Sequence, residues 1–345
     1  MKTILISRTD AIGDVVLTLP MCGWLKKKLP GCKIVFLGST YTQPVVAACA
    51  HVDVFLNIDI LKSLPEEQQI SILQQQVIDA VVHVYPNKLV ARLAQKAAIP
   101  VRVGTRNRWF HWLTCNKLVK LSRRNSPYHE SQLNMLLLSG IGINEIPLSE
   151  MHCYTGLTKV NPLPLWLKED LNKEEKQLNI ILHPKSKGSA REWGLDNFAR
   201  LAGMIYEAGH KVYITGSPAE HEILNTWLQQ QVPFATDLTG RLSLAEFISL
   251  AKAADGLVAC STGTLHIAAA VGTHALGIYP PVRPVHPGRW SPIGAKAEYL
   301  VHAKGCTACA DPQKCSCMAQ VTPEQVFQRV LTWTGPAAPA TKIHL

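Results

Sequence analysis

Short apolar runs alternate with amphipathic stretches over the first half of the chain, which predicts strands that alternate with helices. The apolar runs that predict buried strands lie at residues 2–7, 33–37, 54–58, 79–84 and 101–104. The stretches that predict helices lie at residues 15–29, 41–50, 66–76, 87–98 and 127–140. This alternation is typical of an α/β fold with a parallel, doubly wound sheet, in which ligands bind at the carboxyl ends of the strands.

The alternation resumes after residues 155–178, a segment of prolines and charges that is typical of a linker. Strands are predicted at residues 178–182, 210–215, 256–260 and 273–279, with a short edge piece at 237–240. Helices are predicted at residues 195–207, 218–230, 243–253, 264–271 and from Thr322 onward, and residues 281–304 are rich in loops.

Two Rossmann-like domains with a ligand cleft between them are therefore expected. The predicted divisions are an N-terminal domain at 1–158, a linker at 159–177, a C-terminal domain at 178–320, a helix at 321–334 that could cross back to the first domain, and a frayed tail at 335–345.

The chain of 345 residues carries a net charge of +10, which favours an anionic partner such as nucleic acid, a membrane face or a phosphorylated substrate. The basic residues are spread out and no RNA-binding aromatic motif accompanies them, so nucleic acid is disfavoured. No run approaches the ~18 apolar residues that span a bilayer, and the first residues read as a strand, not as a signal peptide. The basic and aromatic stretch at 105–127, with Arg106 and Arg108, predicts either an acceptor-binding surface or an ordinary surface segment anchored by buried tryptophans.

The turn that follows the apolar run at 256–260 carries the strongest chemical signal. Ser261, Thr262 and Gly263 are small, and a buried helix begins at Thr264. A helix N-terminus with small residues suits a phosphate, because its amides are unpaired and the helix dipole favours negative charge. The alternative is a plain capped helix, in which His266 is an ordinary core residue.

A second loop that suits a phosphate follows the predicted strand at 178–182. It runs from His183 to Trp193 and contains Lys185, Lys187 and Arg191. The sequence has no acidic cluster with metal-ligand spacing beside it, so basic side chains would neutralise a phosphate in place of Mg²⁺. Further along, Glu220 could accept bonds from ribose hydroxyls, or could stabilise the first turn of its helix.

Two carboxylates occur in the loop after the first strand. Asp10 and Asp14 flank Gly13 at the edge where ligands are expected. A carboxylate there can accept a proton from an attacking hydroxyl, and helix capping is the alternative role.

Four of the ten cysteines lie close together in the sequence, at Cys306, Cys309, Cys315 and Cys317. They could bind zinc or form a disulfide, and free thiols in a surface loop are the simpler interpretation.

Taken together, several motifs resemble glycosyltransferase family 9, the heptosyltransferases of lipopolysaccharide core assembly. They are Arg8-Thr-Asp-Ala-Ile-Gly-Asp-Val-Val-Leu-Thr-Leu-Pro20, the stretch from His183 to Leu201, Ser261-Thr-Gly-Thr-Leu-His-Ile-Ala-Ala-Ala270, the stretch from Gly277 to Trp290, the cysteine cluster and Val321-Thr-Pro-Glu-Gln-Val326. The resemblance implies a GT-B fold that binds an acceptor in the first domain and a nucleotide sugar in the second.

The resemblance also implies the chemistry: an inverting, metal-independent transfer without a cofactor, usually from ADP-heptose to an anionic lipid-linked sugar. Such an enzyme would be cytoplasmic and peripherally associated with the inner face of the membrane. Asp14 would be the general base, and Arg191 would face the diphosphate. The other implied donor contacts are His183, Lys185, Lys187, Glu220, Ser261, Thr262, Gly263, Thr264 and His266, and the implied acceptor contacts are Arg8, Asp10, Gly13, Arg106 and Arg108.

This sequence departs from the family pattern at a few positions. Arg191 stands where the family usually has lysine, Ser261 stands where it usually has aspartate, and Lys185 and Lys187 replace small residues. These departures leave open another nucleotide sugar, or a non-catalytic homologue that only binds nucleotide sugars.

Overall fold

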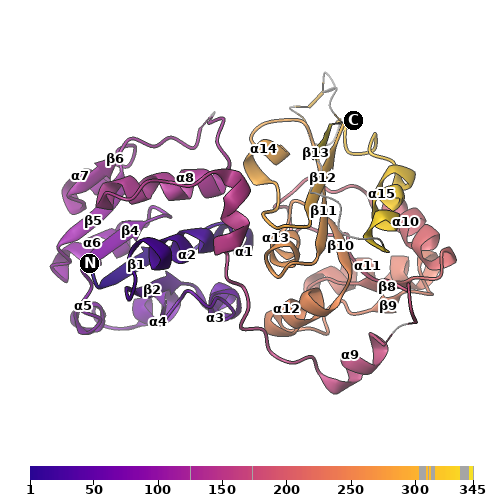
Figure 1. Ribbon diagram of the computed structural model, residues 1–345, viewed down its shortest axis with the longest axis horizontal. Helices are drawn as coiled ribbons and strands as arrows, with labels where there is room; N and C mark the ends of the chain where they lie inside the picture. The colour runs from indigo at the N-terminus through magenta and orange to yellow at the C-terminus, as the bar shows by residue number, and fades with distance from the viewer. Residues whose placement is uncertain are drawn as a thin grey trace. The chain divides into compact units, whose positions relative to one another are not determined.

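The chain folds into two units, each built around its own parallel sheet. The computed structural model describes residues 1–124, 126–172, 174–302, 308–309, 311, 315–334 and 342–344. The units are Met1–Lys159 and Val160–Leu345, and helices cover the sheet in each of them (Figure 1). The α/β, doubly wound architecture predicted from the alternation of elements is confirmed.

The first unit has six parallel strands in the order β3-β2-β1-β4-β5-β6. They are β1 Thr3–Ser7, β2 Lys33–Gly38, β3 Val54–Asn57, β4 Ala80–His83, β5 Val101–Thr105 and β6 Lys117–Val119. The strand order reverses between β1 and β4, where Ser7 pairs with His83. Loops that leave the carboxyl ends of strands at such a reversal form the usual ligand edge of an open α/β sheet.

The helices of the first unit differ from the prediction mainly near the N-terminus. They are α1 Ile12–Val16, α2 Leu19–Lys28, α3 Gln43–Ala47, α4 Ile58–Ser63, α5 Glu66–Gln75, α6 Lys88–Lys96, α7 Trp109–Thr114 and α8 Glu130–Leu136. The prediction of a single helix at 15–29 is wrong, because the helix is interrupted between α1 and α2. Pro20 has no amide to continue the helix, and Ser131 and Asn134 donate hydrogen bonds of 2.6 and 3.2 Å to the Leu17 carbonyl at the break.

The second unit has seven parallel strands in the order β13-β12-β11-β10-β7-β8-β9. They are β7 Asn179–His183, β8 Lys211–Ile214, β9 Thr236–Asp237, β10 Gly256–Cys260, β11 His274–Tyr279, β12 Ala297–Val301 and β13 Lys342–His344. The order reverses between β7 and β10, where His183 pairs with Ala259. The two loops with the strongest phosphate signals leave the carboxyl ends of these two strands.

The helices of the second unit include one inside the predicted linker. They are α9 Leu165–Asp170, α10 Leu195–Glu207, α11 Pro218–Gln231, α12 Leu244–Ala253, α13 Gly263–Ala270, α14 Pro287–Trp290 and α15 Pro323–Leu331. The loop-rich segment predicted at 281–304 contains strand β12. The predicted tail contains β13, which pairs with β12, while residues 335–341 and Leu345 lie outside the described residues.

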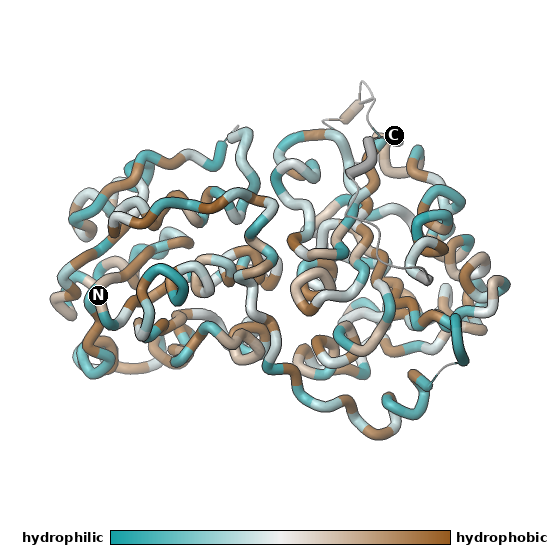
Figure 2. The backbone as a smooth tube through the Cα atoms, in the orientation of Figure 1, coloured by the Kyte–Doolittle hydropathy of each residue, from teal (hydrophilic) through white to brown (hydrophobic). Residues whose placement is uncertain are grey.

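Helix α15 packs within the second unit. Val326 and Val330 are fully buried in a core that also holds Phe198 and Leu201 of α10. The helix therefore contributes to the core of its own unit. Figure 2 shows hydrophobic residues concentrated along the strands, as expected for parallel sheets that are covered on both faces.

Candidate functional site

A buried arginine organises the loop after β1 in the first unit. Arg8 directly follows the strand, and its side chain is 3% exposed. Its Nε donates to Asp10 Oδ1 at 2.7 Å, and its Nη1 donates to Glu130 Oε1 at 3.1 Å. Its Nη2 bonds Asp14 Oδ1, which α1 carries in its first turn. The sequence motif thus brings Arg8, Asp10 and Asp14 together as one ion cluster.

Neighbouring side chains enclose the guanidinium of Arg8. Its Nη1 also donates to Asn134 Oδ1 at 3.2 Å, so three carboxylates and one amide surround the guanidinium. A side chain in this position orients Asp10 and Asp14, whose own side chains remain 23% and 20% exposed. The exposed charge of the cluster is therefore negative.

The sequence analysis missed the residues that complete this cluster. Glu130 is 1% exposed in the first turn of α8, and Arg123 Nε donates to its Oε1 at 2.9 Å. Arg123 also donates to Asn134 Oδ1 at 3.0 Å and to the Val84 carbonyl at 3.2 Å. Glu130 and Asn134 are four residues apart in α8, so they share one face of the helix. This spacing of two polar residues was the signal in the sequence that could have identified them.

Burial changes the acidity of the two exposed carboxyls. Desolvation raises the pKa of Asp14 to about 6, although Arg8 and Arg123 oppose the shift. Desolvation also raises the pKa of Asp10, again against the attraction of Arg8. A carboxylate with a pKa near 6 is ionised at neutral pH and is a stronger base than an ordinary aspartate.

The other residues expected at an acceptor site lie in different surroundings. Gly13 is partly exposed in α1, next to Asp14. Arg106 and Arg108 are exposed beyond the end of β5, where Arg108 precedes α7. The stretch at 105–127 contains both α7 and β6, and its two tryptophans, Trp109 and Trp112, are exposed and not the buried anchors of the alternative interpretation.

In the second unit, Glu192 organises the loop after β7. Its Oε1 accepts from the amide of Ser186 and from Ser186 Oγ, each at 3.1 Å, and its Oε2 pairs with Lys185 Nζ at 2.5 Å. The sequence analysis missed Glu192, since a single glutamate among basic residues gave no motif. Lys185 is therefore held within the loop, whereas Lys187 is exposed.

Arg191 has one terminal nitrogen engaged and one without a partner. Its Nη2 donates to the Cys309 carbonyl at 2.5 Å. Its Nη1 is buried and has no hydrogen-bond partner among the residues that the structure describes. An unpaired buried cationic donor is costly, so this atom favours an anionic ligand.

The turn after β10 leaves its helix start without a side-chain cap. Thr262 is the N-cap residue of α13, but its hydroxyl lies 2.7 Å from Thr264 Oγ1 and makes no capping bond. Gly263 is the first helical residue, and Ser261 bonds the Tyr279 hydroxyl. The capping bond of a plain capped helix, the alternative interpretation, is therefore not made, and the first amides of α13 remain available for an anion.

Three further predicted donor residues are buried. His183 Nδ1 lies 3.0 Å from Thr215 Oγ1, and burial lowers the pKa of His183 despite nearby Glu220. Glu220 Oε2 accepts from the amide of Ser217 at 2.7 Å and forms a capping box at the start of α11. His266 is 3% exposed within α13, as expected of a core histidine.

Three of the four clustered cysteines come together in the structure. The sulfurs of Cys309, Cys315 and Cys317 all lie within 4.8 Å of one another, and Cys306 lies outside the described residues. The Cys309 and Cys317 sulfurs are 3.4 Å apart. A disulfide needs a separation of about 2.05 Å, so these two sulfurs are not bonded.

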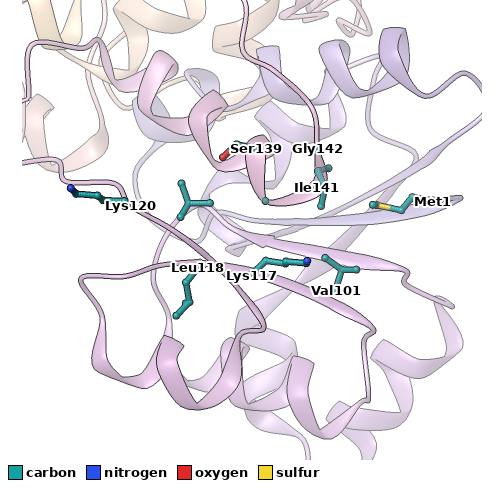
Figure 3. Close-up of a pocket in the computed structure, with 10 residues that line it drawn as sticks. Met1, Val101, Lys117, Leu118, Lys120, Ser139, Ile141 and Gly142 are labelled. Carbon is teal, nitrogen blue, oxygen red and sulfur yellow. The ribbon is translucent and has the colours of Figure 1, made fainter.

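A cavity of about 580 Å³ lies elsewhere in the first unit (Figure 3). The edge strand β6 and residues 139–142 line it, together with Met1 and Val101. None of the predicted site residues contributes to it, and its charged lining is limited to Lys117 and Lys120. We therefore do not assign the candidate site to this cavity.

Helices of membrane-spanning length and hydrophobicity do not occur in the part of the chain that the structure describes.

Comparisons with known proteins point to one family. The sequence model of glycosyltransferase family 9 (heptosyltransferase) matches residues 71–318. A Haemophilus influenzae protein named "Putative glycosyltransferase" is 27% identical over 304 residues, which cover 85% of this chain and 86% of that protein.

Solved structures share the fold across both units. The glycosyl transferase family 9 structure from Veillonella parvula superposes with a TM-score of 0.79 at 19% identity, covering 96% of this chain and 97% of that one. The E. coli ADP-heptose LPS heptosyltransferase II superposes with a TM-score of 0.74 at 18% identity, covering 97% and 98%. Because the family model spans well over half of the 345 residues, the chain belongs to glycosyltransferase family 9 and is a glycosyltransferase with the GT-B fold.

Proposed function

We propose that the protein transfers a heptose from ADP-heptose to a lipopolysaccharide inner-core acceptor, with inversion at the anomeric carbon. Membership of a heptosyltransferase family supports the sugar, and the shared fold with the E. coli enzyme supports the donor and the acceptor class. The observation that carries the proposal is the Asp14 carboxylate, which lies partly exposed beyond β1 with a pKa of about 6.

Asp14 would act as the general base. As the acceptor hydroxyl attacks the anomeric carbon, its proton passes to the carboxylate, and the bond between that carbon and the diphosphate oxygen breaks. ADP then leaves with the bonding electrons. Arg8 holds Asp14 Oδ1 and so fixes the carboxylate, while the desolvation that raises its pKa makes it a better proton acceptor.

The leaving diphosphate would be neutralised by the second unit. Arg191 Nη1, exposed Lys187 and the first amides of α13 supply positive charge in the loops after β7 and β10. We therefore propose that transfer needs no metal ion at the diphosphate. Added Mg²⁺ is expected to leave the rate unchanged, and a strict requirement for Mg²⁺ would contradict this part of the proposal.

A donor panel tests the function directly. The purified chain is incubated with ADP-heptose, UDP-sugars or GDP-sugars and a heptose-deficient lipopolysaccharide, and nucleotide release and acceptor mass are measured. ADP release with a mass gain of one heptose is expected. Release from another nucleotide sugar alone would support the alternative donor, and donor-induced thermal stabilisation without transfer would support a non-catalytic homologue.

The α7 surface supports a membrane-bound acceptor. We define it as Trp109, Trp112 and Leu113, which are 65%, 59% and 68% exposed, with exposed Arg106 and Arg108 beside them. Exposed tryptophans next to basic residues suit the interface of an anionic membrane, where each basic residue contributes about 1 kcal/mol. We propose that the enzyme works at the cytoplasmic face of the inner membrane through this surface.

Vesicle sedimentation of the full chain tests the α7 surface. Binding to vesicles that contain phosphatidylglycerol is expected to fall severalfold in the double variant Trp109→Ser, Trp112→Ser. Trp166→Ser is the matched control, because Trp166 is a 43% exposed tryptophan of the second unit. Equal binding by the double variant and the control would contradict the assignment.

A further inference from the structure

We propose that Cys309, Cys315 and Cys317 bind one zinc ion, which would take no part in making or breaking bonds during transfer. Their sulfurs lie within 4.8 Å of one another. Zinc binds thiolates at about 2.3 Å in a tetrahedral arrangement, which sets ligand sulfurs roughly 3.8 Å apart. The observed cluster therefore needs little adjustment to hold the ion.

The backbone around the cluster is folded in a way that brings the thiols together. Asp311 donates its amide to the Ala308 carbonyl at 2.9 Å, and Cys315 donates its amide to the Asp311 carbonyl at 3.1 Å. These bonds hold Ala308 close to Asp311 and Asp311 close to Cys315, in keeping with the short distances between the sulfurs.

The core of the second unit anchors one end of the site. Cys317 is 1% exposed and precedes Met318, and Val321 is fully buried. The indole of Trp193 donates to the Val321 carbonyl at 2.7 Å. Cys309 and Cys315 are partly exposed, so an ion can enter from solvent, and each thiol releases its proton to solvent on binding.

Thiolate ligands favour zinc over magnesium or calcium, which prefer oxygen. A three-sulfur set is also unlike the open sites of catalytic zinc, in which histidine or carboxylate ligands are common. The ion would fix the segment that carries Cys309, whose carbonyl accepts the 2.5 Å bond from Arg191. This last inference rests on the proposed function, because it links the segment that carries Cys309 to Arg191, the proposed diphosphate ligand.

Metal analysis of the full chain, purified without a metal-affinity tag and under reducing conditions, tests the site. We expect roughly one zinc per chain in the wild type and at least fivefold less in Cys315→Ser and Cys317→Ser. Cys153→Ser is the control, because Cys153 is an exposed cysteine of the first unit and its loss should leave the zinc content unchanged. Equal zinc in all variants, iron in place of zinc, or a Cys309–Cys317 disulfide without metal would each overturn the proposal.

Cobalt titration keeps the proposal testable if the serine variants fold poorly. Wild-type protein is stripped of metal and titrated with Co²⁺, and intense thiolate-to-cobalt absorption that saturates near one equivalent is expected. Weak, non-saturating absorption would overturn it. Neither readout requires transferase activity, so failure of the zinc site and failure of the proposed function are distinguishable. If the segment that carries Cys309 holds Arg191, the stripped protein should also bind ADP more weakly, and zinc should restore that affinity.

Discussion

The loops after β1 and β7 occupy the same place in their two sheets but have opposite arrangements of charge. In the first unit the cation is inside: Arg8 is 3% exposed, and Asp10 and Asp14 lie around it with a fifth or more of their side chains exposed. In the second unit the carboxylate of Glu192 holds the loop together, and Lys187 remains exposed.

The difference indicates how one sheet geometry supports two roles. In the first loop, buried Arg8 binds the side chains of Asp10 and Asp14. In the second loop, Glu192, which is 32% exposed, binds Lys185 and the amide of Ser186. The first loop thus presents carboxylates, which suit proton transfer, and the second presents cations and helix amides, which suit a diphosphate. Exchanging or removing either kind of ion is the direct way to test this comparison.

The largest expected effect is on catalysis in Asp14→Asn. Removing a general base typically lowers the rate by about 10²–10⁴-fold, and we expect kcat to fall by that factor while donor affinity is kept. Asp10→Asn is the matched control, because Arg8 binds both side chains and both carry the same charge. Steady-state kinetics with ADP-heptose measure this. Equal losses in the two variants would remove Asp14 from the role of base.

The next effect is on stability, in Arg8→Gln. Breaking a buried ion cluster by removing one partner costs about 3–5 kcal/mol, because Glu130 and the two aspartates lose their cation. Urea unfolding measures the loss. The corresponding change in the second unit, Glu192→Gln, should cost only about 1 kcal/mol, since its 32% exposed carboxylate stays partly solvated. Similar costs in the two units would contradict the difference in burial.

The sequence was sufficient to predict most helices and strands, but it did not predict which side chains bind the site residues. Helix α10 and strand β10 lie where the apolar pattern predicts them, because parallel strands and amphipathic helices leave strong periodic signals. Arg8, Asp10 and Asp14 were recognised by their motif. Their partners Glu130 and Asn134 come from more than 110 positions away, and no local pattern reports a long-range contact.

The hydrophobic pattern also did not predict the short strand β6 or the interruption between helices α1 and α2. Strand β6 has three residues, too few for an alternation of polar and apolar positions to be evident. The break between α1 and α2 depends on bonds from α8 to the Leu17 carbonyl, which only the folded chain supplies. The sequence left two roles open for Glu220, contact with a ribose or stabilisation of the first turn of its helix. The structure shows that its side chain caps this helix, a bond that the sequence analysis did not predict.

A smaller effect is expected for Arg191→Ala in the second unit. A charged hydrogen bond to a buried partner contributes about 1.5–3 kcal/mol, so the donor KM should rise roughly ten- to hundredfold with little change in kcat. Lys187→Ala, an exposed cation of the same loop, should have a weaker effect. Fluorescence titration with ADP gives the affinities independently of turnover. If Lys187 proves more important than Arg191, the unpaired Nη1 is not the diphosphate ligand.

The pH dependence of the reaction should follow the ionisation of Asp14 in the loop after β1. Because Asp14 must be ionised to accept a proton and burial raises its pKa to about 6, kcat/KM should fall about tenfold per pH unit below that value and level off above it. The charge of Asp10 contributes to the raised pKa, so Asp10→Asn should move the acid limb to lower pH. A pH profile that is flat from 5 to 8, roughly the range around the expected value, would contradict a role for Asp14 in proton transfer.

The smallest expected effect separates capping from ligand binding at Glu220. Two capping boxes in the second unit have the same form: Ser217 with Glu220 at α11, and Ser243 with Glu246 at α12. If Glu220 only caps its helix, Glu220→Gln and Glu246→Gln should each cost about 0.5–1 kcal/mol of stability and leave ADP affinity unchanged. Thermal unfolding and ADP titration of both variants give the comparison. A loss of ADP affinity in Glu220→Gln alone would show that this carboxylate contacts the ribose, because Glu246 controls for the loss of the cap.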